Sequence, residues 1–146
     1  KPGGGQPGAA RLAVGAGAAL VEAAVCGADG LVAALGAATL RQGLARFAAQ
    51  VALARPGVAT DAARESVVEA FDVVVEVALA EGTRYRVSRI AELTGIDAKG
   101  IGAKDLFAYT GDAADPFVAT GVLPRAIADF AGRGVKVDPS LFKRAK

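Results

Sequence analysis

The chain has 146 residues, of which 53% are hydrophobic and 22% charged, a balance that predicts a folded domain rather than a disordered segment. Seventeen basic residues against fifteen acidic ones give a net charge of +2, a balance that does not indicate nucleic-acid binding, because phosphate binding needs a concentrated basic face. The absence of histidine excludes histidine-based catalysis and the common zinc sites, and a single cysteine excludes an internal disulfide.

Membrane and secretion signals are absent from the sequence. No apolar run reaches the ~18 residues that a membrane span requires, and no signal peptide is visible. The chain begins with Lys1 and contains no methionine, so we expect a fragment, a processed chain or a missing start.

The N-terminal part is rich in glycine and alanine. Residues 1–9 predict a flexible leader, because glycine and proline dominate them. Residues 11–16 and 30–36 are short apolar runs ended by glycines, which is the pattern of buried strands, and residues 18–26 suit a short helix between them. We expect Cys26, at the end of this helix, to be buried and unreactive.

Two amphipathic helices are predicted next. Thr39 can cap a helix over residues 40–54, and a second helix is expected over residues 61–71. The apolar positions of both recur at helical spacing: Leu40, Leu44, Phe47 and Val51 in the first, and Ala63, Val67, Val68 and Phe71 in the second.

The remaining elements are mostly strands. Residues 72–79 and 84–93 flank a turn at 81–83 and predict an antiparallel hairpin, to which residues 105–109 add a third strand. A short helix is expected over residues 123–131. The fold class predicted from this order is α/β with an antiparallel β-hairpin appendage, in one domain that spans residues 10–146.

A series of motifs runs from Arg64 to Phe142. The segments are, in order, RESVVEAFDVVV (64–75), EGTRYRV (81–87), IAELTG (90–95), DLFAY (105–109), FVATG (117–121) with PR (124–125), and VKVDPSLF (135–142). In this order they resemble the end of CpaF-like motor ATPases of the type II/IV secretion and pilus-assembly family. The resemblance implies the C-terminal part of a RecA-like P-loop ATPase domain.

The nucleotide-site motifs of that family are degraded in this chain. Residues 27–44 align with its histidine box, but Ala28 and Gly36 stand where the two histidines belong. Ala16 stands in place of the Walker B glutamate, and no Walker A loop, G-x-x-x-x-G-K-[ST], is present. We therefore predict no catalytic residue and no metal ligand. The resemblance implies ATP and magnesium for the intact family and no cofactor for this chain alone.

Six positions of the histidine box persist: Gly27, Asp29, Gly30, Ala37, Arg41 and Leu44. Of these, Asp29, Gly30 and Arg41 are the candidate nucleotide-binding residues. An aspartate between glycines is more often a turn residue than a metal ligand, and an arginine on a helix surface more often pairs locally. A remnant nucleotide site is the alternative for all three.

Arg84, Arg86 and Arg89 are the candidate interface residues. Strand alternation predicts that Arg84 and Arg86 share one face and that Arg89 lies on the other. They are expected to be a solvated edge that discourages strand pairing, with a subunit interface as the alternative.

The resemblance implies a function as well as a fold. Members of this family form hexameric rings at the cytoplasmic face of the bacterial inner membrane and use ATP to assemble pili or secrete proteins. We expect a cytoplasmic chain, with peripheral association at the inner membrane as the alternative. It divides into a degenerate Walker B and histidine-box region (10–57) and a region of helix, hairpin and C-terminal segment (58–146). Expected partners are further copies, an N-terminal ATPase half that supplies the P-loop, and inner-membrane assembly proteins.

Three hypotheses remain open from the sequence. The chain is a partial or degenerate motor subunit without activity of its own. ATP hydrolysis is then a property that the resemblance implies for the intact family. Alternatively it is a pseudoenzyme scaffold that keeps the fold for interactions. A third interpretation is that a frameshift makes the sequence of residues 1–38 unreliable.

Overall fold

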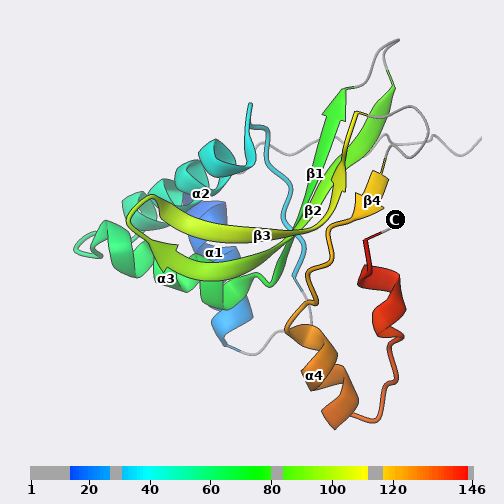
Figure 1. Ribbon diagram of the computed structural model, residues 1–146. Coiled ribbons are helices and arrows are strands. Elements are labelled where there is room, and N and C mark those ends of the chain that lie inside the picture. Colours follow the sequence, from blue (N-terminus) through cyan, green and yellow to red (C-terminus); the bar gives the residue numbers. More distant parts are fainter. Residues whose placement is uncertain (1–13, 27–30, 80–83, 112–116, 145–146) are drawn as a thin grey trace, which may run out of the picture. The chain divides into compact units, whose positions relative to one another are not determined.

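The structure is a computed structural model that describes residues 14–26, 31–79, 84–111 and 117–144. It contains two compact units (Figure 1). The helical unit comprises residues 1–71 and 95–101, and the sheet unit comprises residues 72–94 and 102–146. The predicted leader, residues 1–9, lies outside the described residues. The fold is mixed α/β with an antiparallel sheet, as the sequence predicts at this coarse level.

Three helices build the helical unit: α1 (Val14–Val25), α2 (Leu40–Ala54) and α3 (Thr60–Ala70). The N–H of Gln42 donates to Oγ1 of Thr39 at 3.2 Å, so Thr39 caps α2 as predicted. Helix α2 has the predicted bounds, and α3 is displaced by one residue from the prediction. The periodic spacing of apolar residues explains why both were predictable.

The core of the helical unit lies where the three helices meet. Its buried side chains come from all three helices: Val21, Phe47, Ala48, Val51, Ala63 and Val67. The rings of Phe47 and Phe71 pack edge to face with centroids 5.5 Å apart. Ile101, from the 95–101 segment, packs against this cluster as well.

Both strands predicted for the N-terminal part are wrong within the described residues. Residues 14–16 form the first turn of α1 instead of a strand, because an alanine-rich run has high helix propensity and α1 can bury Val21 in the core. Residues 31–37 are extended but belong to no strand, because they have no strand partner among the described residues. Residues 35–37 approach α2, where Nη1 of Arg46 donates to the carbonyl of Gly36 at 2.8 Å.

Four strands form the sheet: β1 (Val73–Leu79), β2 (Tyr85–Asp97), β3 (Gly100–Tyr109) and β4 (Phe117–Ala119), neighbouring one another in the order β1-β2-β3-β4. The pairs β1–β2 and β3–β4 are antiparallel by register. Only Ala98 and Lys99 connect β2 to β3, and a connection this short requires an antiparallel hairpin.

Strands β2 and β3 are longer than the sequence predicts. Their extension depends on the tight turn between them, in which Oδ1 of Asp97 accepts from the N–H of Lys99 at 2.7 Å. Gly100 then adopts a φ of +114°, which disfavours any residue with a side chain. Pairing across this turn carries the strands through residues 94–104, whose glycines and charges do not by themselves predict a strand.

The C-terminal part of the sheet unit contains α4 (Ala126–Gly132), where a longer helix was predicted, and a 3-10 turn (Pro139–Phe142). Three phenylalanines join this part to the sheet. The ring of Phe107 on β3 lies 6.0 Å from that of Phe117 on β4 and 5.6 Å from that of Phe142, measured between centroids. The C-terminal turn therefore packs against the sheet rather than trailing from it.

Candidate functional site

A β-bulge in β2 determines which face its arginines occupy. Glu76 on β1 is opposite Arg89, and the next residue, Val77, is opposite Val87, so Ser88 is an extra residue in β2. The hydroxyl of Ser88 lies 3.2 Å from the carbonyl oxygen of Glu76 and 3.1 Å from its Oε1, and it can donate to either. The Ser88 hydroxyl therefore ties the bulge to β1 by a hydrogen bond.

The bulge overturns the predicted distribution of the three arginines. Arg86 is opposite Ala78 and Arg89 is opposite Glu76, and these two β1 residues lie on one face of the sheet. Arg86 and Arg89 therefore share a face, although simple alternation separates them. The prediction of a solvated edge is also wrong, because β2 lies between β1 and β3.

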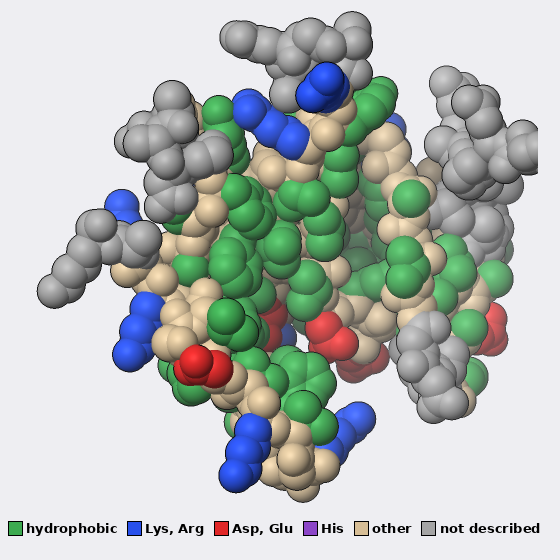
Figure 2. All heavy atoms as spheres, turned by 90° about the vertical axis from the view of Figure 1, so that its right-hand side faces the viewer, with side chains coloured by type: hydrophobic (Ala, Val, Ile, Leu, Met, Phe, Trp, Pro, Cys, Tyr) green, Lys and Arg blue, Asp and Glu red, His purple; other side chains and the backbone are tan. Residues whose placement is uncertain are grey.

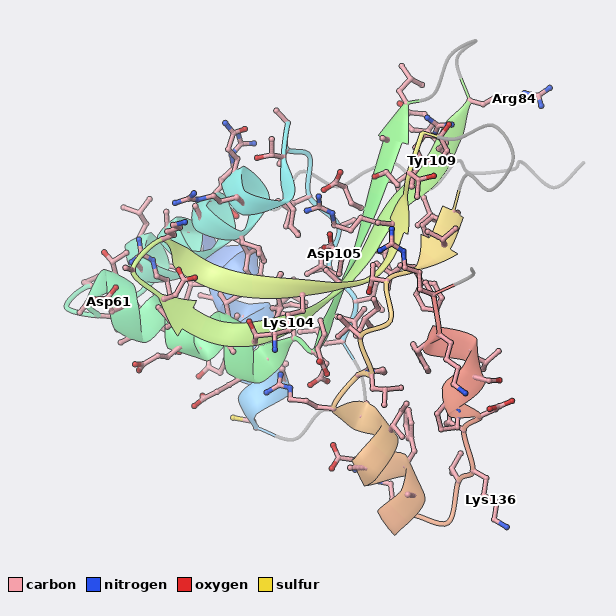
Figure 3. All side chains as sticks on the ribbon, in the orientation of Figure 1. Asp61, Arg84, Lys104, Asp105, Tyr109 and Lys136 are labelled. Atoms are coloured by element: carbon pink, nitrogen blue, oxygen red, sulfur yellow. The ribbon has the colours of Figure 1, made fainter. Side chains whose placement is uncertain are left out.

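Arg86 and Arg89 both interact with β3. The guanidinium of Arg86 lies 3.6 Å from the centroid of the Tyr109 ring, within cation–π range. Nε of Arg89 lies 3.4 Å from Oδ1 of Asp105. Arg84 differs: Figure 3 shows its side chain extending away from the end of the strand. Among the described residues, the side chains of Arg84 and Arg86 have no ion pair or hydrogen bond, and Arg86 differs from Arg84 by its contact with the Tyr109 ring.

The strongest polar contact of the sheet unit joins Glu92 on β2 to Arg125, just before α4. Glu92 is only 5% exposed, although it is ionisable. Its Oε1 accepts from the backbone N–H of Arg125 at 2.8 Å and lies 3.5 Å from Nε of the same residue. Nη2 of Arg125 donates to the carbonyl of Leu93 at 2.5 Å. Without the Arg125 side chain, the buried Glu92 carboxylate would keep only the backbone N–H of residue 125 as a donor, and without the Glu92 side chain that N–H would lose its partner.

Sequence reasoning missed this pair. Both residues belong to motifs of the series that runs from Arg64 to Phe142, Glu92 to IAELTG and Arg125 to the PR dipeptide. The two residues are, however, 33 positions apart along the chain. The available signal was a glutamate between apolar neighbours in the segment IAEL, because such a residue usually has a buried partner.

Thr120 joins two further motifs. Its hydroxyl donates to the carbonyl of Asp105 at 2.5 Å, and its N–H donates to the carbonyl of Leu106 at 2.9 Å. Thr120 belongs to FVATG, and the other two residues belong to DLFAY. These two motifs therefore contact each other within the sheet unit.

The three remnant nucleotide positions are not assembled within the described residues. Asp29 and Gly30 lie outside them. Arg41, on α2, donates from Nη2 to the carbonyl of Lys99 at 2.7 Å, so it holds the β2–β3 turn within the helical unit.

Cys26 is exposed, contrary to the prediction that it is buried. It directly follows the last residue of α1, past the turn in which Val21 faces the core.

Within residues 14–26, 31–79, 84–111 and 117–144, no group of three or more cysteine, aspartate or glutamate side chains could hold a metal ion. In the same part of the chain, no helix has the length and apolar character needed to cross a membrane.

Comparison with known proteins gave no match: no family model matches the chain, and no curated protein matches it either.

Exposed hydrophobic side chains are the other prominent feature of the sheet unit. On β1 and β2 they are Val73, Val75, Val77, Leu79, Tyr85 and Val87, which we call the apolar face. Register places Val77 opposite Val87, and Leu79 opposite Tyr85, so these side chains form one surface. Hydrophobic side chains gather over the centre of the face shown in Figure 2.

A second apolar feature is an open hollow of about 510 Å³ beside α4. Ile127 and Ala131 line its helix side, and residues 134–137 with Pro139 line the other. Together with the apolar face, it leaves apolar side chains of the sheet unit open to solvent.

Proposed function

We propose that this chain is a non-catalytic C-terminal module of a type II/IV secretion or pilus-assembly motor ATPase, derived from a RecA-like domain. The observation that carries the proposal is the contact of Glu92 with Arg125, supported by that of Thr120 with Asp105. These residues match the family's motifs, and in the sheet unit their contacts hold separate segments of the chain together. The positions that would serve nucleotide chemistry carry alanine and glycine instead.

The missing chemistry follows from what phosphoryl transfer requires. A P-loop supplies backbone N–H groups and a lysine to the phosphates, and its hydroxyl helps to hold magnesium. A Walker B carboxylate then assists the metal or the attacking water. This sequence has no P-loop and has Ala16 at the carboxylate position. ATP and magnesium would therefore be bound by a separate N-terminal half or by neighbouring subunits.

The first experiment measures the mass of the purified 146-residue chain by light scattering, with and without magnesium–ATP, alongside phosphate release. We expect no phosphate release and no change in mass with nucleotide. Micromolar binding of magnesium–ATP, or turnover above the buffer blank, would overturn the non-catalytic part of the proposal.

A second experiment tests the family itself. The chain is mixed with an intact, active pilus-assembly ATPase of the family, and its entry into the ring is followed by native mass spectrometry and ATP turnover. We expect the chain to join the ring and to lower turnover in proportion to its share of subunits. Arg125→Ala, which loosens the sheet unit, should join less well than Arg133→Ala. Absence of the chain from the ring would contradict membership of a motor.

A pseudoenzyme scaffold is the second candidate, and the apolar face favours it. Monomeric proteins rarely leave contiguous apolar surface uncovered unless another protein binds there. On this hypothesis the chain stays out of the ATPase ring but binds an inner-membrane assembly protein. A Val75→Lys variant should then weaken that binding while leaving the fold intact.

A further inference from the structure

We propose that β1 pairs with β1 of a second copy of this chain, antiparallel and about a two-fold axis, so that two four-stranded sheets become one of eight strands. This contact is independent of the proposed function. It rests on the sheet order, the orientation of the backbone groups of β1 and the sequence of that strand.

Strand β1 presents backbone groups along its outer edge that have no strand partner among the described residues. It ends the sheet order, and the described residues include no strand beyond it. The carbonyl of Asp72 accepts from the N–H of Leu93 at 2.9 Å, so the backbone groups of Asp72 point toward β2. Because these directions alternate along a strand, Val73, Val75, Val77 and Leu79 turn their N–H and C=O groups outward. An edge of this kind recognises another strand.

The outer edge lacks the features that usually prevent pairing. Natural edge strands carry lysine or proline, are very short, or point a charge into the partner. β1 has seven residues, VVVEVAL, with neither lysine nor proline. Its single charge, on Glu76, is on the half-buried face and contacts Ser88. The outward residues Val75, Val77 and Leu79 are 53%, 53% and 61% exposed.

The same sequence makes a second copy a suitable occupant. Pairing β1 with itself about Val77 sets Val77 opposite Val77 of the second copy and Val75 opposite Leu79. Glu76 is then opposite Ala78, so the two carboxylates are kept apart. A register centred on Glu76 would instead place like charges directly opposite each other, which is destabilising.

The Val75-centred register is less favourable for a different reason. It would bring Phe71 opposite Leu79, but Phe71 packs against Phe47 in the helical unit. In the Val77 register, residues 75–79 of the two copies pair with each other, and all five lie within β1. Because the contact is the same on both copies, it closes at two and generates no longer chain.

Mass and cross-linking test the contact together. The mass of the unmodified chain in solution should rise from one copy to two as its concentration increases from micromolar to several hundred micromolar. Single cysteines are placed at Val75, Glu76 and Val77 in a Cys26→Ser background and oxidised mildly. In the proposed register the two Val77 positions form a hydrogen-bonded pair with Cα atoms about 5.5 Å apart, which suits a disulfide. We expect a dimer cross-link at position 77 alone.

The matched variants are Val77→Lys and Val32→Lys. Val32, in the helical unit, is 93% exposed and lies outside the sheet. Val77→Lys should weaken the dimer at least tenfold, because two lysines would face each other, whereas Val32→Lys should leave it unchanged. Circular dichroism checks that both variants are folded.

Several outcomes would overturn the inference. They are a monomer at every concentration, equal weakening by both lysine variants, an open series of larger species, and cross-linking at 75 or 76 in preference to 77. Entry into an ATPase ring decides the proposed function separately, because neither Val77→Lys nor cross-linking within β1 bears on that assay.

Discussion

Arg125 joins the start of α4 to β2 through its backbone N–H, which meets Glu92, and its guanidinium, which meets both Glu92 and Leu93. The carboxylate it meets is buried, whereas the arginine itself remains largely exposed. The contact therefore gains strength from the low dielectric around the glutamate. Loss of the guanidinium should therefore lower the free energy of unfolding more than a typical surface substitution does.

We expect Arg125→Ala to lower the free energy of unfolding by about 2 kcal/mol, because it removes a charged hydrogen-bond donor from a buried acceptor. Arg125→Lys should lose roughly half as much, since a single ammonium cannot reach both acceptors in the same geometry. Urea unfolding measures both. Arg133→Ala is the matched control, because Arg133 is exposed and its side chain has no partner among the described residues. Equal loss in Arg125→Ala and Arg133→Ala would contradict the role given to the pair.

Asp138 provides a prediction about pH. The hydroxyl of Ser140 donates to Oδ2 of Asp138 at 2.6 Å, and the N–H of Ser140 donates to Oδ1 at 2.8 Å. These two bonds, the hydroxyl first, hold the pKa of Asp138 below its ordinary value of 3.8. A lowered pKa means that the carboxylate stabilises the 3-10 turn above pH 3.8 and loses that effect as the pH falls through the folded-state pKa.

Ser140→Ala should raise the pKa of Asp138 toward 3.8 without fully reaching it, because the backbone N–H still donates. Carbon-detected NMR titration of the Asp138 carboxyl group gives the value. Ser66→Ala serves as control, since the Ser66 hydroxyl donates to the carbonyl of Ala62 in α3, which belongs to the other unit. An unchanged titration in Ser140→Ala would show that the hydroxyl bond is absent in solution.

At the scale of elements, two helix glycines have different surroundings. A Cβ added at Gly17 in α1 would lie 3.4 Å from Cε2 of Phe47, an ordinary packing distance. A Cβ added at Gly43 in α2 would lie 3.2 Å from Cδ1 of Leu35 and 3.3 Å from Cβ of Ala37. The extended 31–37 segment therefore approaches α2 at a position where glycine leaves room for it.

We expect Gly17→Ala to stabilise the protein by about 0.5–1 kcal/mol, because alanine has the higher helix propensity and its methyl group fits against Phe47. Gly43→Ala should gain less or nothing, since Leu35 and Ala37 must move aside. Paired thermal melts of the two variants measure the difference. Equal gains would mean that the 31–37 segment does not pack on α2 in solution.

At the scale of the whole molecule, each unit has its own buried side chains. Val51 is fully buried in the helical unit, and Leu93 is fully buried in the sheet unit. Both tyrosines of the chain, Tyr85 and Tyr109, belong to the sheet unit, and no tryptophan is present. Tyrosine fluorescence therefore reports on the sheet unit, while the far-UV helix signal comes mostly from the other.

Val51→Ala should cost about 2 kcal/mol and Leu93→Ala about 3 kcal/mol, because each opens a cavity in a packed interior. We expect Val51→Ala to shift the helix signal to lower urea concentration more than the tyrosine signal, and Leu93→Ala to do the reverse. Identical shifts of both signals in both variants would show instead that the chain unfolds as one cooperative unit.

The sequence alone determined the elements whose signals are local. The apolar spacing of α2 and α3, the Thr39 cap and the valine-rich run of β1 all act within one or two turns or one strand, so composition and period were sufficient. The mixed α/β class followed from the order of these elements.

Only the tertiary structure decided the rest, because it depends on partners far along the chain. Ser88 inverted the expected faces of the arginines, since a bulge is defined by the register of the opposite strand. The run at 31–37 did not become a strand, because a strand exists only where another lies beside it. Glu92 and Arg125 became partners when the fold brought distant motifs together. Periodicity measures exposure along one segment, whereas contacts of this kind are a property of two segments at once.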